Sequence, residues 1–273
     1  MTARTICDLH SHTLHSDGAL TPEALVELAA SRGVGALAVT DHDTLDGLPA
    51  AVRRGRELGV EVVPGIELSV DEQGKDIHLL GYFVSRPQVL EAALREIREE
   101  RVRRAHRMLE RLAELGCHVE YDAVASRARG GVVGRPHIAA ALLERGHVDS
   151  LNDAFERLIG SDGPAFVPKR TLCLEAGVEL LRRAGAVPVV AHPGVSDCDE
   201  LLPRLRAVGV LGLEVWHPQH DARSTRRYRS VARRHGLVPT GGSDFHREAP
   251  GCNLPGDQRL PLDVLDALRP LAL

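Results

Sequence analysis

The sequence predicts one α/β barrel that is interrupted by a helical insertion. Three observations predict it: strand-like and helix-like segments alternate near both ends of the chain, clusters of histidine and acid follow the apolar runs, and 273 residues with 43% hydrophobic content suffice for one barrel. In a barrel of parallel strands, the carboxyl ends of the strands meet on one face. We therefore expect the polar clusters to converge on that face.

The first part of the chain follows the order strand, helix, strand, helix, strand, strand. Apolar patterning predicts strands at residues 6–9, 36–40, 61–68 and 77–84, and helices at residues 22–32 and 50–58. Thr21 before Pro22 is typical of a helix N-cap. Residues 71–75 have the composition of a turn, so the last two strands are expected to be joined by a turn or hairpin tip.

The pattern changes after residue 86. A long charged helix is predicted from Gln88 to Gly116, and shorter helical pieces follow to about residue 168. Alternation then resumes with helices at 174–184 and 224–235, strands at 187–191, 212–216 and 237–241, and a closing helix at 262–268. We therefore divide the chain into a barrel (residues 1–86 and 171–273) and an inserted helical cap (residues 87–170).

Composition excludes several classes of protein. A net charge of −4 gives no general basic field, so a stable duplex DNA partner is not expected. The five cysteines are scattered without a C-x-x-C pair, which argues against a disulfide framework or a thiolate zinc site. The chain starts without an apolar signal core and has no run of about 20 apolar residues. We expect a cytoplasmic protein without a membrane partner.

Histidines and carboxylates recur in the pattern of metal ligands. They are His10, His12, Asp17, His42, Glu67, His78, His192, Asp244 and His246. Imidazole and carboxylate ligands suit Zn, Mn or Fe, and the absence of thiolates favours an open catalytic site. His10 and His12 are two apart on an extended strand and face the same side, while Glu67 has two oxygens that can bridge two ions. The pattern predicts a polynuclear metallohydrolase site.

Together these motifs resemble the PHP family, named for polymerase and histidinol phosphatase. The motifs are DLHSHTLHSDG at 8–18, TDHDT at 40–44, PGIELS at 64–69, IHLLGY at 77–82, AHPG at 191–194 and GSDFH at 242–246. Resemblance to the TrpH-type branch implies a distorted (β/α)7 barrel with an inserted helical cap and two to three divalent ions of Mn, Fe or Zn. It implies a first metal held by His10, His12, Glu67 and Asp244, a second held by Glu67, His78 and His192, and a third held by Asp17, His42 and His246.

The resemblance also implies phosphoesterase activity on nucleotides or RNA ends. Three divalent ions would exceed the charge of the three carboxylate ligands, so the pocket favours a phosphate ester. The leading activity is removal of the 3′-phosphate from a nucleoside 3′,5′-bisphosphate by a metal-bridging hydroxide, with Glu67, Asp244 and His192 as catalytic residues.

Four other activities are alternatives. The first is 5′–3′ trimming of short 5′-phosphorylated RNA, and the second is hydrolysis of histidinol phosphate. The third is a metal-binding module without turnover. Amide hydrolysis through a carboxylated lysine is disfavoured, because neither Lys75 nor Lys169 ends a predicted barrel strand.

Five residues outside the ligand set are candidates for substrate contact: Arg101, Arg135, His137, His217 and His220. Arg101 interrupts the apolar stripe of the long helix, so it needs an anion, either a substrate phosphate or a protein carboxylate. Arg135 and His137 resemble the cap segment that reaches toward the phosphate in the TrpH-type branch. His217 and His220 follow a strand and are candidates to protonate or orient the leaving group. Lys169 and Arg170 are weaker candidates.

Overall fold

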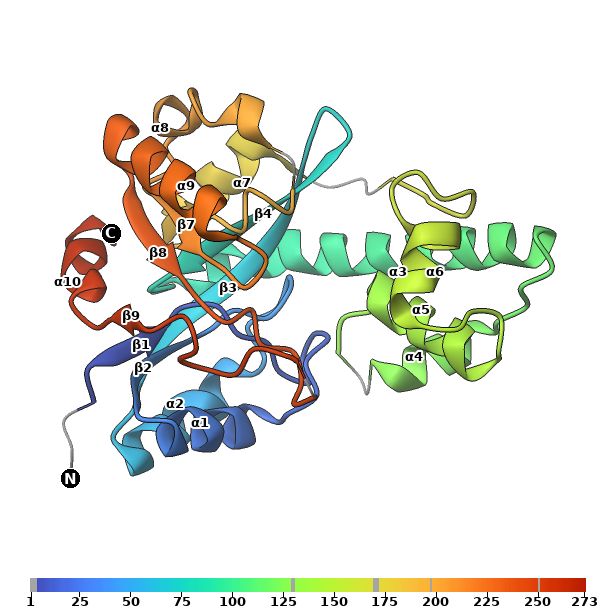
Figure 1. Ribbon diagram of the computed structural model, residues 1–273, viewed down its shortest axis with the longest axis horizontal. Helices are drawn as coiled ribbons and strands as arrows, with labels where there is room; N and C mark the ends of the chain where they lie inside the picture. Colours follow the sequence, from blue (N-terminus) through green and yellow to red (C-terminus); the bar gives the residue numbers. More distant parts are fainter. Residues whose placement is uncertain (1–3, 129–130, 169–171, 197, 250) are drawn as a thin grey trace.

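A strongly curved sheet forms the centre of the computed structural model, which describes residues 4–128, 131–168, 172–196, 198–249 and 251–273 (Figure 1). The strands are β1 (Ile6–Asp8), β2 (Val34–Val39), β3 (Glu61–Glu72), β4 (Lys75–Tyr82), β5 (Leu172–Cys173), β6 (Val187–Val190), β7 (Gly212–Trp216), β8 (Val238–Gly241) and β9 (Leu260–Pro261). Their order is β8-β7-β6-β4-β3-β2-β1-β9, and β5 pairs with β3.

The sheet closes almost completely into a barrel. The backbone N–H of Leu9, just after β1, donates to the carbonyl of Gly241 at the end of β8 across 3.2 Å, which joins the first wall strand to the last. Within the described residues, seven strands form this wall: β1, β2, β3, β4, β6, β7 and β8. The prediction of a distorted seven-stranded barrel is confirmed.

The turn or hairpin tip expected at residues 71–75 is present, so β4 departs from the expected barrel of parallel strands. β4 is antiparallel to both β3 and β6, because Gln73 and Gly74 make a tight turn with positive φ that folds the chain directly back. Two ligands therefore do not follow a strand end as predicted: Glu67 lies inside the long strand β3, and His78 lies near the start of β4. The start of the reversed strand faces the same end of the barrel as the carboxyl ends of its parallel neighbours.

Helices cover the outside of the barrel. They are α1 (Pro22–Ser31), α2 (Leu48–Leu58), α7 (Leu174–Arg183), α8 (Leu205–Val208), α9 (Ala222–His235) and α10 (Val264–Leu268). The predicted N-cap is present, since Thr21 Oγ1 accepts from the N–H of Ala24 at 3.2 Å. α7 packs on β3, β4 and β6, and α9 packs on β7 and β8. No helix in the described part of the chain is both long enough and apolar enough to cross a membrane.

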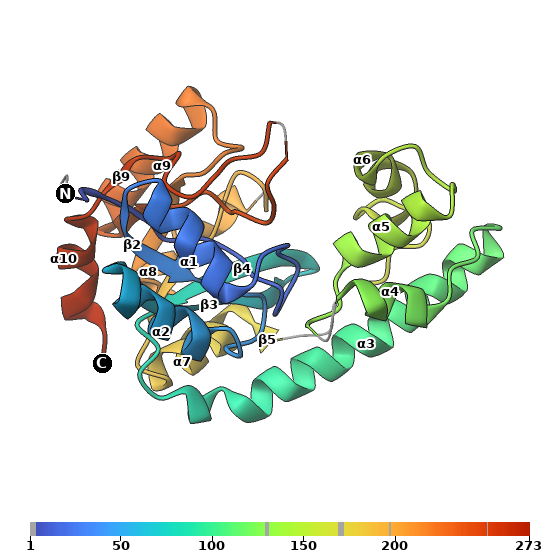
Figure 2. The same cartoon turned by 90° about the horizontal axis from the view of Figure 1, so that it is seen from below.

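The segment between β4 and β5 is helical and extends away from the barrel (Figure 2). It contains α3 (Glu91–Glu114), α4 (Tyr121–Arg127), α5 (Arg135–Glu144) and α6 (Leu151–Ala154). Leu94 and Ile97 of α3 belong to the apolar core of the barrel, whereas Met108 and Leu112 belong to a second core whose buried members lie between residues 105 and 167. We propose residues 87–170 as an inserted subdomain, a division that the second core supports.

Candidate metal centre

The nine predicted ligands lie together at one end of the barrel. Their imidazole rings form a continuous cluster, with ring centroids 5.2 Å apart for His10 and His12 and 4.3 Å apart for His12 and His246. The rings of His78 and His192 are also 5.2 Å apart. The ligands come from segments far apart in the sequence, so the barrel closure itself assembles the cluster.

The first group surrounds the Nε2 atoms of His10 and His12. Glu67 Oε2 lies 3.3 Å from the first nitrogen and 3.2 Å from the second, and Asp244 Oδ1 lies at the same two distances. A tetrahedral ion with bonds of about 2.0–2.1 Å separates its ligands by about 3.3–3.4 Å. Each carboxylate oxygen therefore lies at ligand spacing from both imidazole nitrogens, and His10, His12 and Glu67 form a group that could hold one ion.

The second group uses the other oxygen of Glu67. Its Oε1 lies 2.8 Å from Nδ1 of His78 and 3.0 Å from Nε2 of His192. Glu67 is fully buried, with 1% of its surface exposed, so water cannot compensate its charge. The carboxylate thus has one oxygen in each group, as a bridging ligand requires.

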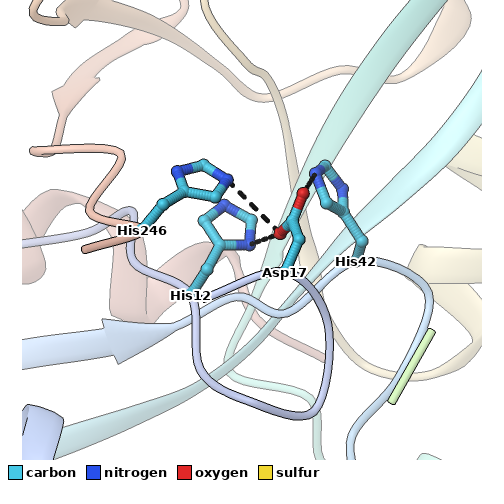
Figure 3. Close-up of side chains that lie close together, drawn as sticks. All are labelled: His12, Asp17, His42 and His246. Atoms are coloured by element: carbon cyan, nitrogen blue, oxygen red, sulfur yellow. Dashed lines mark ion pairs between the residues drawn. The ribbon is translucent and has the colours of Figure 1, made fainter. Parts of the chain in front are cut away.

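The third group contains His12, Asp17, His42 and His246 (Figure 3). Asp17 Oδ1 is 3.3 Å from Nε2 of His246, and Asp17 Oδ2 is 3.7 Å from Nε2 of His42. His42 lies between groups, because its other nitrogen, Nδ1, is 3.1 Å from Glu67 Oε2. Its side chain therefore connects the third group to the bridging carboxylate.

Several buried ligand atoms lack hydrogen bonds within the described structure. They are Nε2 of His10, Nε2 of His12, Nδ1 of His42 and Oδ1 of Asp17. A buried polar atom without a partner costs on the order of 1–3 kcal/mol. These atoms approach carboxylate oxygens or imidazole nitrogens without hydrogen-bond geometry, as ligands aimed at a common ion do. The donor set fits divalent cations.

Three buried carboxylates that the sequence prediction missed hold the ligands in place. Glu214 accepts from Nδ1 of His10 at 3.0 Å and from the backbone N–H of His192 at 2.7 Å. The bond keeps a proton on Nδ1 and directs Nε2 of His10 toward the cluster, the arrangement typical of metal-binding histidine. The sequence did contain a sign of this role, because Glu214 is the one charged residue inside the apolar run LGLEVW.

The other two carboxylates hold loops. Asp8 accepts from the N–H groups of Ser243 (3.0 Å) and Gly256 (2.7 Å), which fixes the loop that carries Asp244. Asp41 accepts from the N–H of Thr13 and from the hydroxyl of Ser16, so it orders the turn that carries Asp17.

The electrostatics keep the carboxylate ligands charged. Burial raises the pKa of Glu67, Asp17 and Asp244, but the surrounding histidines outweigh it and hold all three well below their usual range. For His12, burial lowers the pKa, but Asp244, Glu67 and Asp17 raise it to about 10. Burial dominates at His42 and lowers its pKa to about 3. The three buried carboxylates therefore stay charged, as ligands for cations must.

The GSDFH loop approaches the barrel closely, as its glycines predicted. A Cβ on Gly242 would lie 2.4 Å from the backbone nitrogen of His10, so only glycine fits there. Asp244 has φ of 48° and His192 has φ of 24°, a region that non-glycine residues seldom adopt. The surrounding hydrogen bonds therefore hold two predicted ligands in a strained backbone.

Arg101 has a protein partner. Its Nε donates to Asp43 Oδ2 at 2.7 Å and its Nη2 donates to the hydroxyl of Ser69 at 2.8 Å, and only 9% of its side chain is exposed. The anion that Arg101 needs is thus an aspartate of the TDHDT motif. Of the two anions that the sequence left open for Arg101, the structure shows the protein carboxylate, and contact with a substrate phosphate stays a prediction.

The segment at the start of α5 lies near the cluster. Arg135 Nη2 is 3.4 Å from Asp76 Oδ2, and the guanidinium lies over the rings of Phe155 and Phe166. Nδ1 of His137 accepts from the N–H of Gly134 at 3.0 Å and so caps α5.

His217 and His220, the two histidines that follow β7, differ in their hydrogen bonds. His217 Nε2 lies 3.2 Å from Asp244 Oδ2, and its Nδ1 accepts from the N–H of Gln219, so Nε2 carries the proton that is donated to Asp244. Both ring nitrogens of His220 are used, by the carbonyl of Val215 and the N–H of Gly194. The contact of His220 with a leaving group stays a prediction, and it would require one of these two hydrogen bonds to break. Lys169 and Arg170 lie outside the described residues.

Comparison with known proteins gives a consistent set of relatives. The model of the PHP domain matches residues 8–160. The chain is 34% identical to the 5′-3′ exoribonuclease Rnm of Escherichia coli, with 95% of this chain and 91% of that protein covered. It is 34% identical to the 3′,5′-nucleoside bisphosphate phosphatase of Chromobacterium violaceum (89% and 87% covered). It is 37% identical to the phosphoribosyl 1,2-cyclic phosphate 1,2-diphosphodiesterase of Eggerthella lenta (88% and 93% covered).

The fold has a close match among solved structures. A protein from Bifidobacterium adolescentis, assigned as a metal-dependent phosphoesterase, superposes with a TM-score of 0.84 at 30% identity. The superposition covers 97% of this chain and 96% of that one. The match therefore includes both the barrel and the inserted helices.

Proposed function

The chain belongs to the PHP family and is a metal-dependent phosphoesterase, and from this premise we propose that it removes the 3′-phosphate from a nucleoside 3′,5′-bisphosphate. The product is the 5′-monophosphate. The observation that carries the proposal is the buried cluster of histidines and carboxylates, four of whose buried ligand atoms lack a hydrogen bond within the described residues. The bisphosphate phosphatase relative supports the choice of substrate.

The proposed ligand sets overlap with the three groups, in which His12 also lies beside Asp17 and His42 also lies beside Glu67 and His78. His10, His12, Glu67 and Asp244 hold one ion, Glu67, His78 and His192 a second, and Asp17, His42 and His246 a third. When bound, divalent ions polarise phosphoryl oxygens and lower the pKa of water so that it can attack phosphorus near neutral pH. Mn, Fe and Zn all suit this donor set.

The protein's own residues set the geometry of the reaction. Glu67 connects the two groups through its two oxygens, and Glu214 keeps His10 in the tautomer that a metal requires. His217 donates to Oδ2 of Asp244, so Oδ1 stays directed at His10 and His12. We assign His217 as a positioning residue for Asp244.

Arg135 and His137 remain proposed substrate contacts above the cluster. The Arg135 side chain lies near Asp76, and Asp76 Oδ1 is also 3.4 Å from Nε2 of His78. A guanidinium at this place can grip a phosphate oxygen through parallel hydrogen bonds. His137 uses only Nδ1 for the helix cap, so its Nε2 remains available to donate.

Trimming of short 5′-phosphorylated RNA is the second candidate. The relative Rnm, which matches nearly the full chain, supports it. Both reactions break a phosphoester bond at a 3′ oxygen beside a 5′-phosphorylated nucleoside, so one site can serve both.

The test offers Mn-loaded protein a panel of substrates at equal concentration. The panel contains adenosine 3′,5′-bisphosphate, a short 5′-phosphorylated RNA, a phosphoribosyl 1,2-cyclic phosphate and histidinol phosphate. We expect the highest kcat/KM for the bisphosphate, with AMP as the product. A higher value for RNA would replace the leading proposal with the second candidate.

A variant links the activity to the cluster. Glu67→Gln should lower kcat/KM by on the order of 10²–10³-fold, since it removes the charge that connects two groups. Glu57→Gln, on the exposed surface of α2, is the matched control and should leave turnover unchanged. Full activity in Glu67→Gln would overturn the assignment of the bridging residue.

A further inference from the structure

A cavity of about 410 Å³ opens directly beside the metal cluster. Asp17, Asp244 and His246 form its inner wall, so a group bound in the cavity touches the first and third ligand groups. Its volume falls within the range of about 300–1,000 Å³ that is typical of small-molecule sites. The cavity is large enough for one nucleotide and too small for a nucleic-acid duplex.

The remaining walls come from both parts of the fold. Pro136 of α5 and Leu151 of α6 approach from the inserted helices, and Pro218 approaches from the loop after β7. Gln219 and Asn253 add amide groups, which can donate and accept hydrogen bonds. Apolar surface with a few amides suits the sugar and base of a nucleotide.

One positively charged side chain, that of Arg247, lines the cavity. Arg247 follows the predicted ligand His246 directly, and it is the one charged lining residue in the described chain besides the metal-ligand candidates. Its side chain is exposed, and no ion pair involves it within residues 4–128, 131–168, 172–196, 198–249 and 251–273. Arg101 and Arg135, by contrast, already face Asp43 and Asp76.

We propose that Arg247 binds the second phosphate of the substrate, the 5′-phosphate that is not cleaved. In this arrangement the 3′-phosphate lies at the cluster, the nucleoside fills the cavity, and the guanidinium holds the 5′-phosphate through charge-assisted hydrogen bonds. The inference rests on the proposed function and adds the residue that distinguishes a bisphosphate from a monophosphate.

The first experiment compares two substrates. Wild type, Arg247→Ala and Arg247→Lys are assayed with adenosine 3′,5′-bisphosphate and with adenosine 3′-monophosphate, which lacks the 5′-phosphate. Arg247→Ala should lose roughly 10- to 100-fold in kcat/KM for the bisphosphate, mainly through KM, the loss expected for a hydrogen bond to a charged group. The kcat/KM of Arg247→Ala for the monophosphate should change less than about twofold. Arg247→Lys should recover part of the kcat/KM that Arg247→Ala loses on the bisphosphate.

A binding measurement separates this inference from the proposed function. Calorimetry compares AMP with adenosine, using metal-loaded and metal-free protein, and Arg229→Ala on the exposed surface of α9 is the matched control. We expect Arg247→Ala to abolish the preference for AMP over adenosine, while the control retains it. If the wild type leaves the bisphosphate intact, the proposed function fails, and the AMP preference still decides whether Arg247 binds a 5′-phosphate.

Two results would overturn the inference. Equal losses of kcat/KM on the two substrates in Arg247→Ala would mean that Arg247 acts on the metal cluster or on folding. An unchanged preference for AMP in Arg247→Ala would mean that its guanidinium does not contact the 5′-phosphate.

Discussion

The barrel rim and the inserted helices face each other with opposite chemistry. The rim gathers carboxylates and imidazoles, whereas the inserted helices contribute arginines such as Arg101 and Arg135. The acids that these arginines meet, Asp43 and Asp76, lie next to or near the predicted ligands His42 and His78 in the chain. The segment after β2 and the first half of β4 therefore supply both predicted metal ligands and the acids that the arginines of the inserted helices contact.

Removing an anchor should affect stability more than any other change considered. Arg101→Ala removes the guanidinium that the buried Asp43 carboxylate faces, so the free energy of unfolding should fall by about 3 kcal/mol or more. Chemical denaturation followed by circular dichroism measures this. Arg103→Ala, an exposed arginine of the same helix, is the control and should change stability little. Equal midpoints for both variants would show that the anchor contributes nothing.

Removing a carboxylate that holds a predicted ligand in place should instead affect metal affinity. Glu214→Gln keeps the size of the side chain but removes the charge that holds His10 Nδ1–H, so affinity for Mn should fall about 10- to 100-fold. Metal titration followed by calorimetry measures the dissociation constant. The exposed Glu175→Gln is the matched control. If Glu214→Gln lowered stability as much as Arg101→Ala and left metal affinity intact, the contrast between rim and anchor would be wrong.

The smallest expected effect is the release of protons when metal binds. Without metal, the pKa of His12 is raised to about 10, so its ring is protonated at pH 7, whereas a metal ligand must be neutral. Metal binding at pH 7 should therefore release at least about one proton, and affinity should rise as pH increases toward 10. Calorimetry in two buffers with different ionisation enthalpies counts these protons. Identical heats in the two buffers would contradict the raised pKa.

The sequence predicted which side chains converge better than it predicted their surroundings. Alternating segments and recurrent histidines indicated the barrel and the nine side chains that meet at one end of it, because both follow from local patterns. The reversed direction of β4 depends on a turn of two residues, and the pattern of apolar residues is the same for either direction. The pairing of Arg101 with Asp43, 58 residues away, depends on how α3 crosses the barrel, which no local signal encodes. The engagement of both nitrogens of His220 is equally non-local.

Helix α3 belongs to two apolar cores at once, and this limits how the inserted segment can vary. Its first turns, with Leu94 and Ile97, complete the barrel, while its later turns, with Met108 and Leu112, begin the second core. Loss of the whole insertion would remove Leu94 and Ile97 from the apolar core that they share with β3 and β4. Changes to the insertion should therefore disturb the barrel least when they fall beyond the middle of α3.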